Sequence, residues 1–340
     1  MSRLQIDMLP VGDADAFIIE VQLDGPAEVV LIDGGKDWED GERVLRQLGA
    51  YYGGRVDHLV LSHIDVDHAG GLLHVVENLE PDRIGRAWIH DLAKHGVDVP
   101  KAISMARGLA DEAESEAVRT VATHLADSVE TTQRLITALE GRGVAVEEPF
   151  ADANNRIGPM EVLGPTQAFF EERIQFYADV KMLDRMVEQG ISFRRRKTAG
   201  SGPAAPDEVL AAAIDDPEAE KQASAILLLV YEGDKYLFCG DAGRAAFGAC
   251  PDLEKARGLH LLKVPNHGSK HNLDPELLDL LRPALAYISG SGVGINPHPD
   301  LVTALKNRGA VIYTTAHSGN VWHRRGDVPP RTGFETRRPM

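Results

Sequence analysis

The alternation of apolar and polar residues divides the chain into strand-rich ends around a helical middle. Short, mostly apolar runs that end in turn residues are typical of β-strands. Such runs occupy residues 4–9, 17–23, 28–32, 55–61, 84–89, 144–146, 157–163, 225–231, 235–238, 260–264, 284–288, 310–314 and 320–323. Because turns separate the first three runs, we expect the chain to begin with antiparallel strands.

Two stretches interrupt this pattern and favour helices. Residues 101–140 are rich in Ala, Glu, Leu and Thr, and residues 166–220 also have helical character. We predict that both are helical insertions in a single domain, whose core comprises about 1–100, 141–165 and 221–325. Within the second insertion, the basic and then breaker-rich segment 193–203 predicts an exposed, mobile loop. Residues 326–340 are rich in Pro and Arg, and we expect a frayed tail there.

The densest group of metal-ligand side chains follows the fourth predicted strand. Residues 62–71 read SHIDVDHAGG, which places His63, Asp65, Asp67 and His68 on one short loop. Alternate residues of such a loop can point toward one spot, and the adjacent pair can face a second. Histidine nitrogens and aspartate oxygens are ligands for divalent metals such as zinc and manganese. A polar loop with two ordinary surface histidines is the alternative, but four ligand-type residues in six positions favour a metal site.

Other polar residues also follow predicted strands. Asp33 precedes two glycines, Asp241 follows Gly240, and His267 begins the sequence His-Gly-Ser. Strands of one sheet end along a common edge, so side chains that are distant in sequence can meet there. A two-metal hydrolase needs roughly six protein ligands and a bridging carboxylate. We expect Asp241 to be the bridge and His267 to be a late ligand.

Composition narrows the choice of function. The 340 residues include 36 basic and 52 acidic side chains, so the net charge of -16 argues against a protein that coats nucleic acid nonspecifically. It does not exclude a nuclease, because bound metals reverse the local field. Two cysteines give no disulfide framework or zinc knuckle. The first residues do not resemble a signal peptide, and the apolar run 225–231 is too short to span a membrane. We therefore predict a soluble cytoplasmic protein without a membrane partner.

The motifs together resemble those of the metallo-β-lactamase fold superfamily. Within it, they are most similar to the hydrolase domain of the competence protein ComEC. The matching segments, in chain order, are GDADA at 12–16, LIDGG at 31–35, SHIDVDHAGG at 62–71, CGD at 239–241, VPNHGS at 264–269 and PHP at 297–299. The resemblance implies an α/β fold, a four-layer αβ/βα sandwich, two divalent metals at the sheet edge and hydrolysis of phosphodiesters in DNA.

The resemblance also implies a division of the metal ligands. One metal would be held by His63 and Asp65, the other by Asp67, His68 and His267, and Asp241 would bridge them. Three histidines and three carboxylates make a harder donor set than an all-histidine site, so manganese and magnesium stand beside zinc. The sequence departs from the ComEC-like pattern at Asn266, where a histidine is usual.

Further residues are predicted to meet the substrate or to support the loop. Ser269, Lys270 and His298 are candidates for substrate binding, and Asp67 and His298 for catalysis, since imidazole titrates near working pH. We expect Asp33 to accept backbone N–H groups of a loop rather than to bind metal. The remaining histidines, His124 among them, are predicted to be ordinary surface or core residues.

The sequence therefore predicts a metal-dependent hydrolase, a phosphodiesterase or nuclease that attacks DNA with a hydroxide activated by two metals. A hydrolase of a small ester, thioester or lactone is the first alternative. The second is an effector whose insertions bind another protein and whose loop near residues 194–202 is cut to release activity. Steep salt dependence would distinguish DNA from a small neutral substrate.

Overall fold

The computed structural model describes residues 2–153, 155–197, 204–293, 296–316, 319–331 and 339–340. The first of its two sheets has seven strands in the order β14-β1-β2-β3-β4-β5-β6. Their bounds are β1 Arg3–Met8, β2 Phe17–Gln22, β3 Glu28–Ile32, β4 Val56–Val60, β5 Ile84–Trp88, β6 Ala145–Glu147 and β14 Val321–Gly326. Strands β1 to β3 are antiparallel, as the turns predict, whereas β3 to β6 are parallel. The loop that follows β4 therefore lies at the edge where parallel strands end.

The second sheet also has seven strands, in the order β13-β12-β11-β10-β9-β8-β7. Their bounds are β7 Arg156–Ile157, β8 Met160–Gly164, β9 Ile226–Tyr231, β10 Asp234–Phe238, β11 Leu261–Lys263, β12 Leu285–Ile288 and β13 Val311–Thr314. Strands β9 and β10 form an antiparallel hairpin, and β10 to β13 are parallel. The loops after β10 and β11 consequently leave the sheet on the same side.

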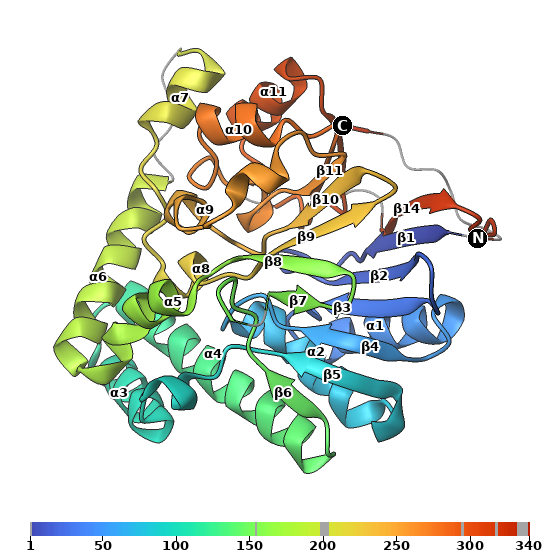
Figure 1. The fold of residues 1–340 in the computed structure, drawn as a ribbon. Coiled ribbons are helices and arrows are strands. Elements are labelled where there is room, and N and C mark those ends of the chain that lie inside the picture. Colours follow the sequence, from blue (N-terminus) through green and yellow to red (C-terminus); the bar gives the residue numbers. More distant parts are fainter. Residues whose placement is uncertain (1, 154, 198–203, 294–295, 317–318, 332–338) are drawn as a thin grey trace.

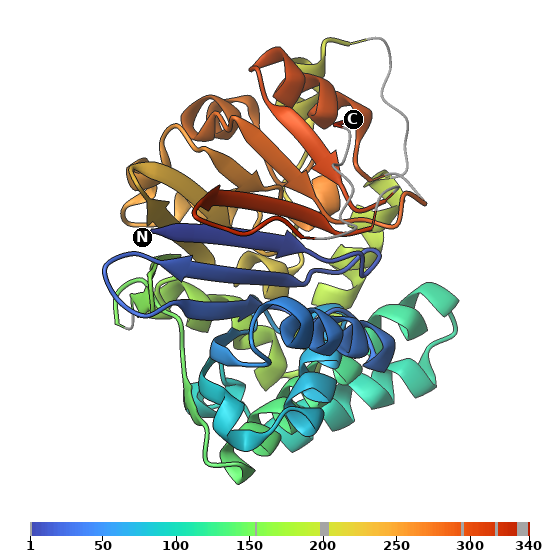
Figure 2. The same ribbon diagram turned by 90° about the vertical axis from the view of Figure 1, so that its right-hand side faces the viewer.

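The two sheets face each other, and helices cover their outer faces (Figures 1 and 2). One apolar cluster lies between the sheets, with inward side chains such as Phe17 and Phe238 in edge-to-face contact. Two further clusters pack the helices onto the outer faces. These helices are α1 Trp38–Tyr51 and α2 Val66–Asn78 on the first sheet, and α9 Arg244–Gly248, α10 Pro275–Leu281 and α11 Pro299–Asn307 on the second. The predicted four-layer αβ/βα sandwich is confirmed.

The two middle stretches are helical, as predicted. They form α3 Val99–Glu112 and α4 Glu116–Gly141, then α5 Gln167–Arg173, α6 Val180–Lys197, α7 Pro206–Ala212 and α8 Ala219–Gln222. Helices α3 to α6 share a separate apolar cluster at one end of the sandwich (Figure 1). Short 3₁₀ helices occupy Pro81–Arg83, Leu92–His95, Ile174–Ala178, Leu253–Ala256 and Asn266–Gly268.

Two segments that the sequence predicts to be irregular contain ordered structure. The prediction of a loop from residue 193 is wrong as far as Lys197, because α6 continues through the basic residues; the rest of that loop, 198–203, lies outside the described residues. Arginine and lysine are good helix formers, which explains the extension. In the segment predicted as a tail, the Arg331 guanidinium is buried against Asp7 of β1. Within the described part of the chain, no helix has the length and apolarity needed to cross a bilayer.

Candidate metal centre

Close backbone packing fixes the loop after β4. Gly34 donates its N–H to the His68 carbonyl, and Gly71 donates to the Gly35 carbonyl. A Cβ on Gly71 would lie 1.8 Å from the Gly34 carbonyl oxygen, so no larger residue fits there. Only glycine permits this approach of the β3 loop to the first turns of α2. The contact holds Asp33 beside the histidine loop.

Asp33 anchors both histidines of that loop. Its Oδ1 accepts the Ser62 N–H at 2.7 Å, the backbone bond expected from the sequence. Its Oδ2 accepts hydrogen bonds from the Ser62 hydroxyl at 2.7 Å and from His68 Nδ1 at 2.8 Å. Because the Ser62 hydroxyl proton is directed to Asp33, its oxygen accepts from His63 Nδ1 at 3.0 Å. Both imidazoles therefore use Nδ1 as a donor and keep Nε2 for another partner.

His267 is held in the same manner from the second sheet. Its Nδ1 lies 3.3 Å from the Ser289 hydroxyl, which donates in turn to the buried Asp15 carboxylate. Its Nε2 lies 3.7 Å from Asp241 Oδ2. Anchoring of one ring nitrogen by a hydroxyl or carboxylate is the usual support of a metal-binding histidine.

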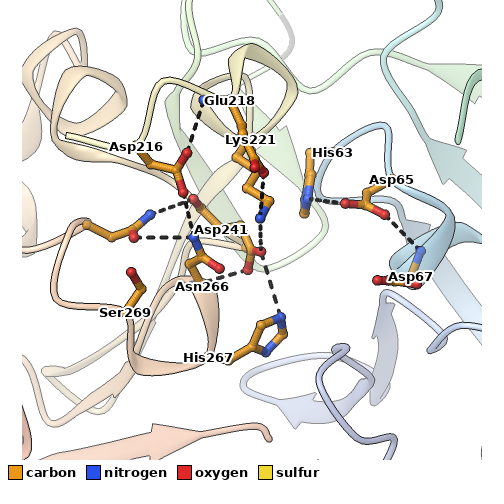
Figure 3. Close-up of polar contacts among 12 residues, drawn as sticks. His63, Asp65, Asp67, Asp216, Glu218, Lys221, Asp241, Asn266, His267 and Ser269 are labelled. Atoms are coloured by element: carbon orange, nitrogen blue, oxygen red, sulfur yellow. Dashed lines mark hydrogen bonds and ion pairs between the residues drawn. The ribbon is translucent and has the colours of Figure 1, made fainter. Parts of the chain in front are cut away.

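A strained turn brings His267 to Asp241. Asn266, His267 and Gly268 have φ values of 46°, 53° and 82°, all in the left-handed region. Asparagine tolerates this conformation better than most residues, which gives Asn266 a structural role at the position where the sequence departs from the ComEC-like pattern. Its N–H donates to Asp241 Oδ1 at 3.1 Å, and its side chain donates to Asp216 at 2.8 Å (Figure 3). A strained backbone conformation persists only where surrounding contacts hold it, and these hydrogen bonds hold the turn.

Two buried lysines also approach Asp241. Lys263 Nζ contacts Asp15, the Gly240 carbonyl at 2.7 Å and Asp241 Oδ1 at 3.5 Å. Lys221 Nζ lies 2.8 Å from Glu218 and 3.9 Å from Asp241 Oδ2 (Figure 3). Although burial opposes it, these cations and His267 hold the pKa of Asp241 well below its usual range. Neither lysine was singled out from the sequence, because a lysine within a strand or a short helix carries no motif.

Five of the six predicted ligands fall into two adjacent groups. His63, His68 and Asp241 form the inner group, in which all three side chains are buried and offer ligand atoms within 4.8 Å of one another. Asp65 and Asp67 form an outer group with His124 of α4, within the same distance; Asp65 is buried, and the other two are partly exposed. His267 belongs to neither group, although its Nε2 lies 3.7 Å from Asp241. Sequence reasoning missed His124, since a lone histidine in an amphipathic helix gives no signal of what it faces. Asp15, Asp33 and His68 also lie within this distance, but the hydrogen bonds described above already use them.

The charge states of the two loop histidines differ. Burial and the neighbouring His68 lower the pKa of His63 to about 4, so its ring is neutral at pH 7. Burial alone would lower the pKa of His68 too, but the Asp33 carboxylate overcomes this and raises it to about 10. A metal at His68 would thus replace a proton, whereas His63 presents a lone pair at neutral pH.

The residues predicted to meet the substrate lie apart from these groups. Ser269 is fully buried and accepts the His271 N–H. Lys270 lines a pocket of about 370 Å³ against α7. His298 caps α11, where its Nδ1 accepts the Asp300 N–H at 3.3 Å, and its own N–H donates to the Gly268 carbonyl. The contacts described here for Ser269, Lys270 and His298 are all with residues other than the six predicted ligands.

The donor set fits a divalent metal. His63 Nε2 and Asp67 Oδ1 are buried atoms without a hydrogen-bond partner, although each is a strong ligand atom. Most buried polar atoms in proteins are paired, and these two lie among other ligand-type side chains, so a bound cation would supply the partner that each lacks. Fold and site together define an αβ/βα sandwich with a candidate metal centre at its sheet edge.

The comparisons agree with this class. Residues 9–146 match the family model described as metallo-beta-lactamase superfamily. Members of this superfamily are metallo-hydrolases and typically bind divalent metals. No curated protein matches the chain.

Solved structures of similar proteins include the metallo-beta-lactamase fold protein YhfI from Bacillus subtilis. It shares 9% identity over 94% of this chain and 100% of its own, with a TM-score of 0.43. Another is AidC, a dizinc quorum-quenching lactonase, with 12% identity over 93% of this chain and 81% of its own and a TM-score of 0.35.

Proposed function

We propose that this protein is a metal-dependent phosphodiesterase that acts on DNA. The observation that supports this most is the shared anchoring of His63, His68 and His267. Each ring donates through Nδ1 into a network that ends on a buried aspartate, and each leaves Nε2 as its remaining ligand atom. Metal-binding histidines are usually anchored in this way, so the arrangement supports a metal site over an ordinary polar loop.

The residues that would hold the metals are the six predicted ones. They are His63, Asp65, Asp67, His68, Asp241 and His267. Bound divalent ions would supply an activated water and neutralise charge that develops on the phosphoryl oxygens. The mixed imidazole and carboxylate donors suit manganese or zinc, with magnesium as a third choice.

The outer edge of the site supports an anionic substrate. The side chains of Asp67 and His124 are about 30% and 27% exposed, so this edge is open while the inner group is covered. Lys36, whose side chain is 65% exposed, lies 3.7 Å from Asp67 there and could contact a phosphate. Asp67 would then lie where the scissile bond approaches. His298 is our candidate for proton donation to the leaving oxygen.

A small ester, thioester or lactone is the second candidate substrate. The observation in its favour is the burial of the inner group, because His63, His68 and Asp241 are each only 1% exposed. A DNA duplex is too wide to reach these buried side chains unless its ends separate. A compact acyl group is small enough to reach them. We also propose that DNA binds at this site and that the helical insertions can bind a protein partner.

The decisive experiment is cleavage of supercoiled plasmid by the metal-stripped protein after addition of manganese, zinc or magnesium. We expect nicking that depends on metal, is absent from Asp67→Ala and weakens steeply with salt. Metal-loaded protein that leaves DNA intact but hydrolyses a lactone or thioester, with little salt dependence, would replace DNA by the second candidate. Full activity of Asp67→Ala or His267→Ala would refute the metal centre itself.

A further inference from the structure

Helix α4 reaches the metal loop through two side chains on one face. His124 and Ser128 are four residues apart, so both point the same way from the helix. His124 Nε2 lies 3.1 Å from Asp65 Oδ1, and Ser128 Oγ accepts the Val66 N–H at 3.0 Å. Val66 is the first residue of α2, whose N–H has no partner within its own helix. The inserted helix is thus joined to the loop that carries the predicted ligands.

The separation of these atoms fits joint coordination of a cation. Two ligand atoms bound about 2.1 Å from one metal at angles of 90° to 110° lie roughly 3.0–3.4 Å apart. The distance of 3.1 Å between His124 and Asp65 falls in this range, and Asp67 offers a third atom within 4.8 Å of both. Nitrogen and oxygen donors in this combination suit manganese or zinc.

Unpaired atoms on both sides of Asp65 support a cation there. Asp67 Oδ1 is buried without a hydrogen-bond partner, and the Lys36 ammonium approaches it only to 3.7 Å. On the other side, His63 is 1% exposed and its unpartnered Nε2 lies 3.8 Å from Asp65 Oδ2 (Figure 3). Asp65 therefore lies between the inner and outer groups and directs one oxygen toward each.

The balance of charge also distinguishes the two groups. The inner group has one carboxylate, Asp241, and the ammonium groups of Lys221 and Lys263 both lie within 4 Å of it. The outer group has two carboxylates. Among the described residues, the ion pairs recorded for them involve Lys36, His63 and His124. A divalent cation would neutralise the two outer carboxylates.

We infer that His124 is a metal ligand supplied by the α3–α4 insertion, and that it completes an outer divalent-cation site with Asp65 and Asp67. This inference rests on the proposed metallo-hydrolase function, because two of its ligands belong to that centre. It makes the insertion part of the active site. Removal of the His124 imidazole would weaken the binding of the outer ion and leave the binding of the inner ion unchanged.

The test is metal binding to the full chain after chelator treatment, with Mn²⁺ as the probe. Titration calorimetry and the electron paramagnetic resonance of bound Mn²⁺ report the number of ions and their nitrogen ligands. We expect two ions in the unmodified protein. In His124→Ala, the outer ion should bind 10- to 100-fold more weakly and lose one imidazole coupling. The matched control is His74→Ala, which removes a helical histidine that is likewise paired with a carboxylate, Glu42, and should leave both ions unchanged.

A second variant separates ligation from mere support of Asp65. The amide of His124→Gln can still donate a hydrogen bond to Asp65 but carries no imidazole. If His124→Gln restores the unmodified affinity, or if His124→Ala binds both ions normally, His124 is no ligand and only this inference fails. If the unmodified protein binds no Mn²⁺ or Zn²⁺, the proposed function fails with it. Thermal unfolding of the metal-free variants checks that each is folded.

Discussion

Asp7 and Asp241 are both buried carboxylates, but their surroundings differ. Asp7 accepts hydrogen bonds from Gln47 and Tyr52 and forms a two-bond ion pair with Arg331 at 2.8 and 2.9 Å. Arg331 in turn stacks on aromatic rings, with Trp322 at 4.4 Å. Burial still raises the pKa of Asp7, although Arg331 opposes this. The network of Asp7 is closed within the chain.

The cluster around Asp241 is not closed. Lysines and hydrogen bonds satisfy Asp241 itself, but the neighbouring His63 Nε2 and Asp67 Oδ1 have no hydrogen-bond partner. Burial of a polar group costs free energy unless a partner compensates it. The difference teaches how to separate a structural network from a binding site inside one protein. A complete network stabilises the fold, whereas unpaired ligand-type atoms gathered beside other such side chains mark a candidate binding site.

The comparison first predicts a large loss of stability at Arg331. Arg331→Met leaves the Asp7 carboxylate buried without its counter-ion, which should lower the free energy of unfolding by about 3–5 kcal/mol. Chemical denaturation measures this. Metal binding and turnover per folded molecule should not change. The double variant Asp7→Asn with Arg331→Met should recover much of the loss, and an unrecovered double variant would show that packing of the arginine matters more than its charge.

Asp67→Asn should have the opposite effect: it should lower the rate of hydrolysis and leave the stability of the metal-free protein nearly unchanged. It keeps the shape of a side chain whose buried oxygen lacks a hydrogen-bond partner, so we expect the metal-free protein to unfold at nearly the same denaturant concentration. Loss of a charged ligand should reduce the rate of hydrolysis by about 10²–10³-fold. Steady-state kinetics at saturating metal test this. A marked loss of stability without loss of rate would invert the comparison.

Metal removal should affect only the incomplete cluster. At a free metal concentration about 100 times its dissociation constant, binding should stabilise the native state by about 2.7 kcal/mol. Thermal unfolding with and without chelator measures the difference. We expect the same increment in Arg331→Met and a smaller one in Asp67→Asn. Equal increments in both variants would place the metal elsewhere.

Acid should weaken the fold through His323, whose ring contacts Tyr236 and His260. Burial, together with His260 and Arg325, lowers the pKa of His323 to about 4. The folded chain thus resists protonation that the unfolded chain accepts near pH 6.5. The resulting stability is complete above pH 6.5 and is lost as the pH falls toward 4. Because the ring is partly exposed, we expect about 1–2 kcal/mol. His323→Gln should flatten this dependence in denaturation series, and an unchanged slope would assign it to other groups.

Local sequence was enough to predict most of the strands and the meeting of the histidine loop with the segment of Asp241 and His267. In these segments the candidate ligands follow strands directly, so one rule of sheet geometry brings them together. His124, Lys221 and Arg331 could not be found in this way. Each meets its partner through packing between distant elements, which depends on how a helix rotates or how a terminal strand pairs. The sequence around them contains no trace of that partner.

The pairing of β14 with β1 has a consequence for synthesis on the ribosome. Strand β1 can pair with β2 early, but its other partner, β14, is made after all the other strands described here, and the Arg331 counter-ion of Asp7 emerges later still. Contacts of such long sequence separation form late. The inner group is likewise divided between the loop that holds His63 and His68 and the distant Asp241. A nascent chain therefore cannot assemble the candidate metal centre before Asp241 has emerged.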